Sequence, residues 1–166
     1  MSDFTPHPSA GMKPQRLLLV GGCGGIGRAV AQAAVQAGAQ VAVLDLPISI
    51  ERHPLSGVHL LPIDAKDPAS VDQAVAKAAA KLGGIDGCVN LVGYMSAPLA
   101  LADTPTEVWQ EVMHGNLDSA FYISRAVMPH LHASTNGSMV HISSGLGAWP
   151  GPCMAHMARP RRACCC

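Results

Sequence analysis

The chain has 166 residues, of which 49% are hydrophobic and 13% are charged, and its formal net charge is zero. This composition fits one globular domain with its own core and argues against a disordered protein. Because there is no surplus of Lys and Arg to neutralise phosphates, we expect no nucleic-acid partner. No run reaches the roughly 18 apolar residues of a membrane helix, so we also expect no membrane partner and a cytoplasmic protein.

The two ends of the chain differ from the rest in composition. Residues 1–15 carry Asp3 and three prolines and lack the apolar core of a signal peptide, so we expect a disordered leader there. Four of the six cysteines fall in the last fourteen residues, and adjacent cysteines do not easily close a tetrahedral metal site. We therefore expect no metal site, one domain over residues 16–152 and an aberrant tail over residues 153–166.

Short apolar runs that predict buried strands alternate with helical patterns along the chain. The runs lie at residues 16–20, 40–44, 58–63, 87–92 and 138–143. Helices are predicted over residues 26–37, over residues 67–82 and from residue 104 onward. The alternation predicts an α/β fold with a doubly wound parallel sheet of the Rossmann type, incomplete after the fifth strand.

The long third helix carries its own start and stop signals. Thr104, Pro105 and Glu107 have the spacing of a capping box with a proline inside it. Pro129 lies near the other end of the helical pattern. We expect the helix to begin at this capping box and to be interrupted near Pro129.

Three glycines lie between the first strand and the first helix. At Gly21, Gly25 and Gly27 the chain has no side chains, so the backbone can approach a pyrophosphate held at the helix N-terminus. Glycine also serves tight turns, but here it stands in the strand-turn-helix context that such a motif requires. The pattern predicts dinucleotide binding.

An acidic residue, Asp45, ends the second strand eighteen residues after Gly27. At this place a carboxylate accepts hydrogen bonds from both ribose hydroxyls and repels a 2′-phosphate. No Lys or Arg stands among residues 22–24 to pair with that phosphate. The pattern favours NAD over NADP, and the alternative is a solvated acid at a strand end.

The glycine turn resembles the Thr-Gly-x-x-x-Gly-x-Gly loop of the short-chain dehydrogenases/reductases. The matching residues are Gly21, Gly25, Ile26 and Gly27, whereas Val20 replaces the threonine. Other positions match in the expected order, and the resemblance spans Arg16 to about Pro152. It implies a homo-oligomeric parent protein that uses NAD and carries hydride between the nicotinamide and an alcohol or ketone.

The resemblance also assigns roles to residues after the second strand. It implies that Asp64 and Ala65 line the adenine pocket. Asn90 and Gly93 are the two matches to the family's Asn-Asn-Ala-Gly at the end of the fourth strand. The segment is a partial match, and it implies a place beside the cofactor for both residues.

Two further residues match the family's catalytic positions. Asn116 is similar to the asparagine that holds a water in the proton relay, and Ser144 is similar to the serine that hydrogen-bonds the substrate carbonyl. Without the resemblance, Asn116 is an ordinary polar helix residue and Ser144 a serine that ends a strand.

The tyrosine and lysine of the family's reaction are missing. Met157 stands where the tyrosine is expected, thirteen residues after Ser144, and Arg161 stands at the lysine position. The codons of the tail, reread one base earlier, allow a Tyr-x-x-x-Lys motif at these positions, which leads to the hypothesis of a frameshift between about Gly145 and Cys153. We expect the chain as given to have almost no dehydrogenase activity. The alternative is a dinucleotide-binding module without catalysis.

Overall fold

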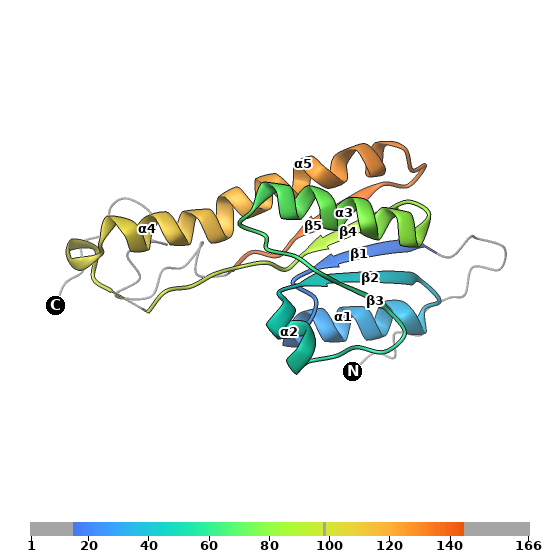
Figure 1. Cartoon of the computed structure of the whole chain (residues 1–166), viewed down its shortest axis with the longest axis horizontal. Coiled ribbons are helices and arrows are strands. Elements are labelled where there is room, and N and C mark those ends of the chain that lie inside the picture. The colour runs from blue at the N-terminus through green and yellow to red at the C-terminus, as the bar shows by residue number, and fades with distance from the viewer. Residues whose placement is uncertain (1–14, 98, 145–166) are drawn as a thin grey trace, which may run out of the picture.

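The computed structural model describes residues 15–97 and 99–144. Within them lies one parallel sheet in the order β3-β2-β1-β4-β5 (Figure 1). Its strands are β1 (Arg16–Val20), β2 (Gln40–Asp45), β3 (His59–Pro62), β4 (Gly87–Asn90) and β5 (Ser138–His141). The order reverses between β1 and β4, so the doubly wound Rossmann-type fold is confirmed, and this reversal is where such sheets bind ligands.

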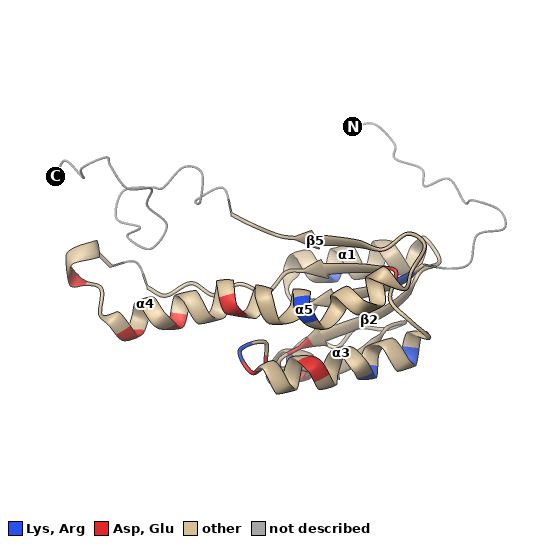
Figure 2. Ribbon diagram, turned by 90° about the horizontal axis from the view of Figure 1, so that it is seen from above, with Lys and Arg blue, Asp and Glu red and all other residues tan. Residues whose placement is uncertain are grey.

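Helices cover both faces of the sheet. On one face lie α1 (Gly25–Gln36) and the short α2 (Pro47–Arg52). On the other lie α3 (Pro68–Leu82) and α5 (Ser119–His132), which pack against each other (Figure 1). The remaining elements are η1 (Leu101–Asp103), α4 (Thr106–Met113) and the π-helical η2 (His114–Asp118). Helix α4 extends beyond the end of the sheet (Figure 1 and Figure 2).

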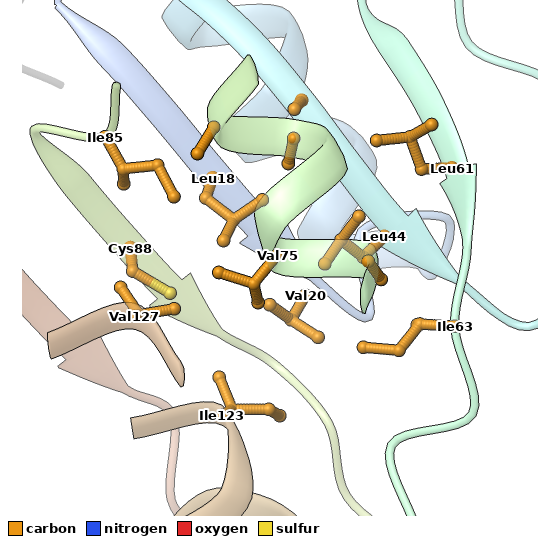
Figure 3. Packing of buried hydrophobic residues seen from close by; sticks show 14 of the residues in the cluster. Leu18, Val20, Leu44, Leu61, Ile63, Val75, Ile85, Cys88, Ile123 and Val127 are labelled. Atoms are coloured by element: carbon orange, nitrogen blue, oxygen red, sulfur yellow. The ribbon is translucent and has the colours of Figure 1, made fainter. Parts of the chain in front are cut away.

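The apolar run in β1 is explained by burial on both faces. Leu18 and Val20 pack toward α3 and α5 (Figure 3). Leu19 packs toward α1. All three side chains are fully buried. Because neighbouring residues of a strand point to opposite faces, a strand covered on both sides needs a continuous apolar sequence.

The start of α3 follows its sequence signals. Asp67 precedes the helix and its Oδ1 accepts a hydrogen bond from the backbone N–H of Ala69 over 3.0 Å. Pro68 occupies the first turn, where its missing N–H costs no hydrogen bond. At the other end, Gly83 takes the left-handed conformation, with φ of 71°.

Two expectations for the long helix are wrong. Thr104 does not cap α4, because its hydroxyl donates to the carbonyl of Ala100 over 2.9 Å and the helix begins at Thr106 after Pro105. Pro129 does not interrupt α5, which continues to His132. A proline this close to a helix end removes one backbone bond only, and the last turn tolerates the loss. The interruption lies instead at η2, where the helix changes from α-helical to π-helical turns.

Strand β5 is an edge of the described sheet. It pairs with β4, and the side chains of Val140 and Ile142 are 49% and 46% exposed. The predicted aberrant tail and nearly all of the predicted leader lie outside the described residues. In the part of the chain that the structure describes, no helix has the length and apolar character needed to cross a membrane.

Candidate functional site

A cavity of about 500 Å³ opens at the carboxyl ends of the central strands. It is bounded by the glycine turn after β1, the end of β2 with α2, and the loops after β3 and β4. Its lining residues include Gly21, Cys23, Gly24, Asp45, Leu46, Ser49, His53, Asp64, Ala65, Lys66, Val92, Gly93, Tyr94 and Gly115. The cavity therefore occupies the place where open α/β sheets bind their ligands.

Two glycines of the turn are required by the protein itself. Gly21 has a φ of 80°, and a Cβ there would lie 3.1 Å from the backbone of Leu91. A Cβ on Gly27 would lie 2.5 Å from the Cα of Gly22, closer than real Cβ atoms approach. These residues let the turn, α1 and the loop after β4 pack closely together.

Gly25 is different, because no heavy atom outside its immediate surroundings lies within 4 Å of a Cβ built on it. Packing within the chain therefore does not explain a glycine here. Gly25 lies in the first turn of α1, whose N-cap residue Gly24 offers no side-chain cap. The N–H groups and the helix dipole at such an end attract an anion, and the space at Gly25 is open.

Ile26 shares this helix end and is 63% exposed. Gly25, Ile26 and Gly27 lie in α1 and do not line the cavity, whereas Gly21 and Gly24 do. Of the residues predicted to bind phosphate, Gly21 therefore lines the cavity and the others lie beside it in the first turn of α1.

Asp45 lines the cavity at the end of β2, with its carboxylate held by two backbone groups. Its Oδ2 accepts the N–H of Cys23 and its Oδ1 accepts the N–H of Leu46, each over 2.8 Å. A carboxylate has about four acceptor positions, so lone pairs remain for a ligand. The sequence did not single out Cys23, which fixes this carboxylate relative to the glycine turn.

The Cys23 thiol lies beside Asp45 and is almost fully buried. Burial, together with the Asp45 carboxylate, raises the pKa of this thiol to about 11. The thiol is therefore protonated at neutral pH, and Asp45 is the anionic group at this point of the site.

Asp64 and Ala65 line the opposite part of the cavity after β3. The Oδ1 of Asp64 accepts the N–H of Lys66 over 2.9 Å, which shapes this loop. The Lys66 ammonium lies 4.7 Å from the centre of the Tyr94 ring and 3.3 Å from Oε1 of Glu111. The side chain of Lys66 thus joins this loop to the loop after β4 and to α4, a role that no local sequence pattern indicated.

The predicted residues Asn90 and Gly93 flank the loop after β4, which forms one wall of the cavity. Asn90 is buried, and its Oδ1 accepts the N–H of Val92 over 3.0 Å. Asn90 therefore shapes the loop from beneath, whereas Val92 and Gly93 line the cavity.

Asn116 lies in the π-helical segment η2 and holds the same loop from the other side. Its Oδ1 accepts the N–H of Tyr94 over 3.0 Å, and its Nδ2 donates to the carbonyls of Tyr94 and Val112 over 2.7 and 2.8 Å. One side chain thus satisfies both backbone groups of Tyr94. Widened helical turns of this kind are frequent at functional sites.

The matching family model is that of the short chain dehydrogenases, and it covers residues 15–158. The chain belongs to this family. Its members named below are dehydrogenases, and the fold and the place of the cavity agree with an oxidoreductase of this type.

Two relatives illustrate the family's range. A 2-dehydro-3-deoxy-L-rhamnonate dehydrogenase (NAD(+)) of Sphingomonas sp. (strain SKA58) is 28% identical over 81% of this chain and 55% of its own length. A short chain dehydrogenase/reductase of Macrophomina phaseolina (strain MS6), dpmpG, is 33% identical over 86% of this chain and 89% of its own length. The chain spans about half the length of the first relative.

Solved structures support the same fold. NAD⁺-bound xylitol dehydrogenase superposes with a TM-score of 0.79 and 27% identity over 86% of this chain and 58% of that one. The aldohexose dehydrogenase of Thermoplasma acidophilum gives a TM-score of 0.77 with 23% identity over 87% of this chain and 55% of that one. The second similarity concerns the fold alone.

Ser144, the family's catalytic serine by its sequence match, follows β5 at the same edge of the sheet as the cavity. It is exposed, and β5 pairs with β4 so that His141 lies opposite Asn90. Met157 and Arg161, which stand at the tyrosine and lysine positions of the short chain dehydrogenases, lie outside the described residues. The described residues therefore include the cavity and the strand end that carries Ser144.

Proposed function

We propose that the chain binds NAD in the cavity and belongs to a protein that moves hydride between the nicotinamide and an alcohol or ketone. The observation that carries this proposal is the fixed carboxylate of Asp45 at the cavity wall. Its remaining lone pairs would accept the 2′- and 3′-hydroxyls of the adenosine ribose. A 2′-phosphate at this place would meet a carboxylate and no Lys or Arg from residues 22–24, so NADP is disfavoured.

The space at Gly25 supports the same assignment. The pyrophosphate would lie against the N-terminus of α1, with Gly21 and Gly27 allowing the turn to approach it and Ile26 beside it. The adenine would lie against Asp64, Ala65 and the loop from Asn90 to Gly93, the walls of the cavity away from α1. The NAD named for the rhamnonate relative and bound in the xylitol dehydrogenase structure agrees with this choice of cofactor.

Catalysis would depend on residues on the β5 side. When bound, the nicotinamide supplies or accepts the hydride. Ser144 would donate a hydrogen bond to the substrate oxygen, and Asn116 would support the proton relay. Because Met157 and Arg161 replace the acid-base tyrosine and its lysine, the chain as given would hold cofactor with almost no turnover.

A second candidate function is that of a dinucleotide-binding module without catalysis. The residues at positions 157 and 161 favour it, because methionine at the tyrosine position cannot exchange a proton and arginine stands in place of the lysine. The frameshift hypothesis explains the same residues differently. Resequencing the DNA across codons 145–166 separates the two, because an additional base would restore the Tyr-x-x-x-Lys frame, and its absence would favour the module.

Fluorescence titration with NADH and NADPH tests the proposed function directly. We expect saturable binding of NADH, with NADPH at least about tenfold weaker as the result of one charge repulsion. Competition by AMP, which carries the adenosine and one phosphate, would locate the site at the adenosine part of the cavity. Equal affinity for the two cofactors, or no binding at all, would contradict the proposal.

A further inference from the structure

The Asn90 side chain is buried beneath the proposed cofactor site. Its amide nitrogen lies beside the imidazole of His141, which can carry its proton on either ring nitrogen. Its Oδ1 accepts the Val92 N–H, and its Nδ2 lies 3.2 Å from Nδ1 of His141 on β5. Asn90 is buried, with 3% of the residue exposed, so protein groups decide how its amide is oriented. Because Val92 offers a donor, the amide oxygen must face Val92 and the amide nitrogen must face His141.

The remaining contacts of His141 agree on the direction of every hydrogen bond. The Nδ1 atom must accept from Asn90, so in the neutral ring the proton is on Nε2. The Nε2 atom lies 3.2 Å from the Ser124 hydroxyl on α5, and that hydroxyl donates to the carbonyl of Ala120 over 2.6 Å. The chain of hydrogen bonds runs from Asn90 through His141 and Ser124 to the backbone of α5. Every bond in it can form only when the imidazole is neutral with its proton on Nε2.

A second proton on His141 would break this chain at the buried end. The new N–H on Nδ1 would point at the Nδ2 of Asn90, which is also a donor. Rotating the Asn90 amide would place its nitrogen against the Val92 N–H, again with two donors facing each other. In the first case the bond between Asn90 and His141 is lost, and in the second the bond between Val92 and Asn90. Either way a buried donor is left without a partner beneath the loop that lines the cavity, which destabilises its surroundings.

We propose that His141 is a positioning residue of the cofactor site, which supports the loop after β4 through Asn90 when neutral and loosens it when protonated. The inference rests on the proposed binding of NAD in the cavity, which Val92 lines. It predicts that cofactor affinity falls on acidification, because protonation makes both ring nitrogens of His141 donors.

Other titratable groups lie on the two elements that contact His141, β4 and α5. On β4 the group is Cys88, and burial raises the pKa of its thiol to about 12, so it stays neutral. On α5 the groups are Tyr122, Arg125, His130 and His132. The Arg125 guanidinium lies 3.4 Å from the Asp72 carboxylate and near the rings of Phe121 and Tyr122.

Nuclear magnetic resonance of the histidine ring nitrogens tests the bond directions without cofactor. We expect the Nε2–H form of His141 at about pH 8, and slower hydrogen exchange of the Val92 amide at pH 8 than at pH 5.5 after correction for intrinsic rates. The Nδ1–H form, or Val92 protection that does not change with pH, would overturn the proposal. Circular dichroism at both pH values confirms that the chain remains folded.

Binding of NADH at the same pH values tests the link to the site. For the wild type we expect the Kd to rise about five- to tenfold from pH 8 to pH 5.5, the effect of one lost hydrogen bond. His141→Asn retains an acceptor for Asn90 and cannot gain a proton, so its Kd should match the wild type at pH 8 and rise less at pH 5.5. His141→Leu removes the acceptor, so its Kd should be raised at both pH values.

His132→Gln is the matched control, because it removes an exposed histidine of α5 and should retain the pH dependence of the wild type. Equal pH dependence of the wild type and His141→Asn would overturn the proposal and assign the effect to another group, such as His53 in the cavity wall. Failure of every variant to bind NADH at pH 8 would instead contradict the proposed function. The ring form and the Val92 exchange would then still decide whether His141 positions Asn90.

Discussion

The Asp45 carboxylate accepts a hydrogen bond from the backbone N–H of Cys23 over 2.8 Å. This bond joins the end of β2 to the glycine turn after β1, two segments that are 22 residues apart. The two parts of the chain proposed to bind ribose and pyrophosphate therefore hold each other in position. A preformed arrangement of this kind lowers the conformational entropy that the protein loses when a ligand binds.

Removing the charge of Asp45 should weaken NAD binding and reduce discrimination against NADP. For Asp45→Asn we expect the Kd for NADH to rise about tenfold, because hydrogen bonds to charged groups contribute about 1.5–3 kcal/mol. The Kd for NADPH should change less, since the repulsion of its 2′-phosphate is removed at the same time. Glu51→Gln, on the neighbouring helix α2 but outside the cavity lining, is the control. An unchanged ratio of the two affinities would contradict the role of Asp45.

Alanine substitutions at Gly25 and Gly27 should distinguish a glycine required for ligand binding from one required for packing. Gly27→Ala should lower the free energy of unfolding by about 1–3 kcal/mol, because its methyl group overlaps the backbone of Gly22. Gly25→Ala meets no protein atom and should retain the wild-type stability, while weakening NADH binding about tenfold or more. Urea unfolding and NADH titration of both variants check this. A Gly25→Ala chain that binds NADH normally would show that the phosphate does not lie at α1.

Asn116 should contribute to stability through the loop after β4. Asn116→Ala removes three hydrogen bonds to Tyr94 and Val112, so we expect the free energy of unfolding to fall by about 2–3 kcal/mol. Hydrogen exchange of the Tyr94 amide should accelerate. Leu117→Ala in the same π-helical segment is the control, because Leu117 is 58% exposed and its truncation should change stability little. Equal losses in the two variants would show that the segment, and not the amide, matters.

Local patterns were sufficient to predict most of the sheet and its main helices. The strands could be predicted because burial on both faces demands apolar runs, and α3 because Asp67 and Gly83 mark its ends. Helix α2 was not predicted, since its six residues are too few to show an apolar period. The change of helix type at η2 was also missed. It accompanies bonds between Asn116 and Tyr94, which are 22 residues apart in the chain.

The residues of the candidate site also divide into those with a local sequence signal and those without one. Gly21, Gly25 and Asp45 carry a sequence signal because of their positions relative to a strand end, and their roles in binding are proposals. The contacts of Lys66 with Tyr94 and Glu111, and of His141 with Asn90 and Ser124, could not be predicted. Each depends on side chains from different loops or strands, which only the folded chain brings together. Such contacts carry no signal in a single sequence.

The ion pair between Asp86 and Arg16 should make stability depend on pH at the opposite end of the sheet. The Arg16 guanidinium donates to Asp86 over 2.9 and 2.5 Å, and Ser134 donates to the same carboxylate over 2.8 Å. The hydrogen bonds from Arg16 hold the pKa of Asp86 well below its usual range, which Ser134 reinforces against the opposing effect of burial. These contacts join the start of β1, the turn before β4 and the loop before β5.

Because the folded-state pKa of Asp86 lies below the unfolded value of about 3.9, its contribution to stability is present above that value and is lost as the pH falls toward the folded value. Asp86→Asn should therefore lower the free energy of unfolding at pH 7, and the difference from the wild type should shrink between about pH 5 and pH 3. Urea unfolding of both chains at these pH values measures it. Asp103→Asn, an exposed carboxylate in η1, should show no such convergence. If the difference between Asp86→Asn and the wild type stayed constant down to pH 3, packing and not the charge would be the source of the stabilisation.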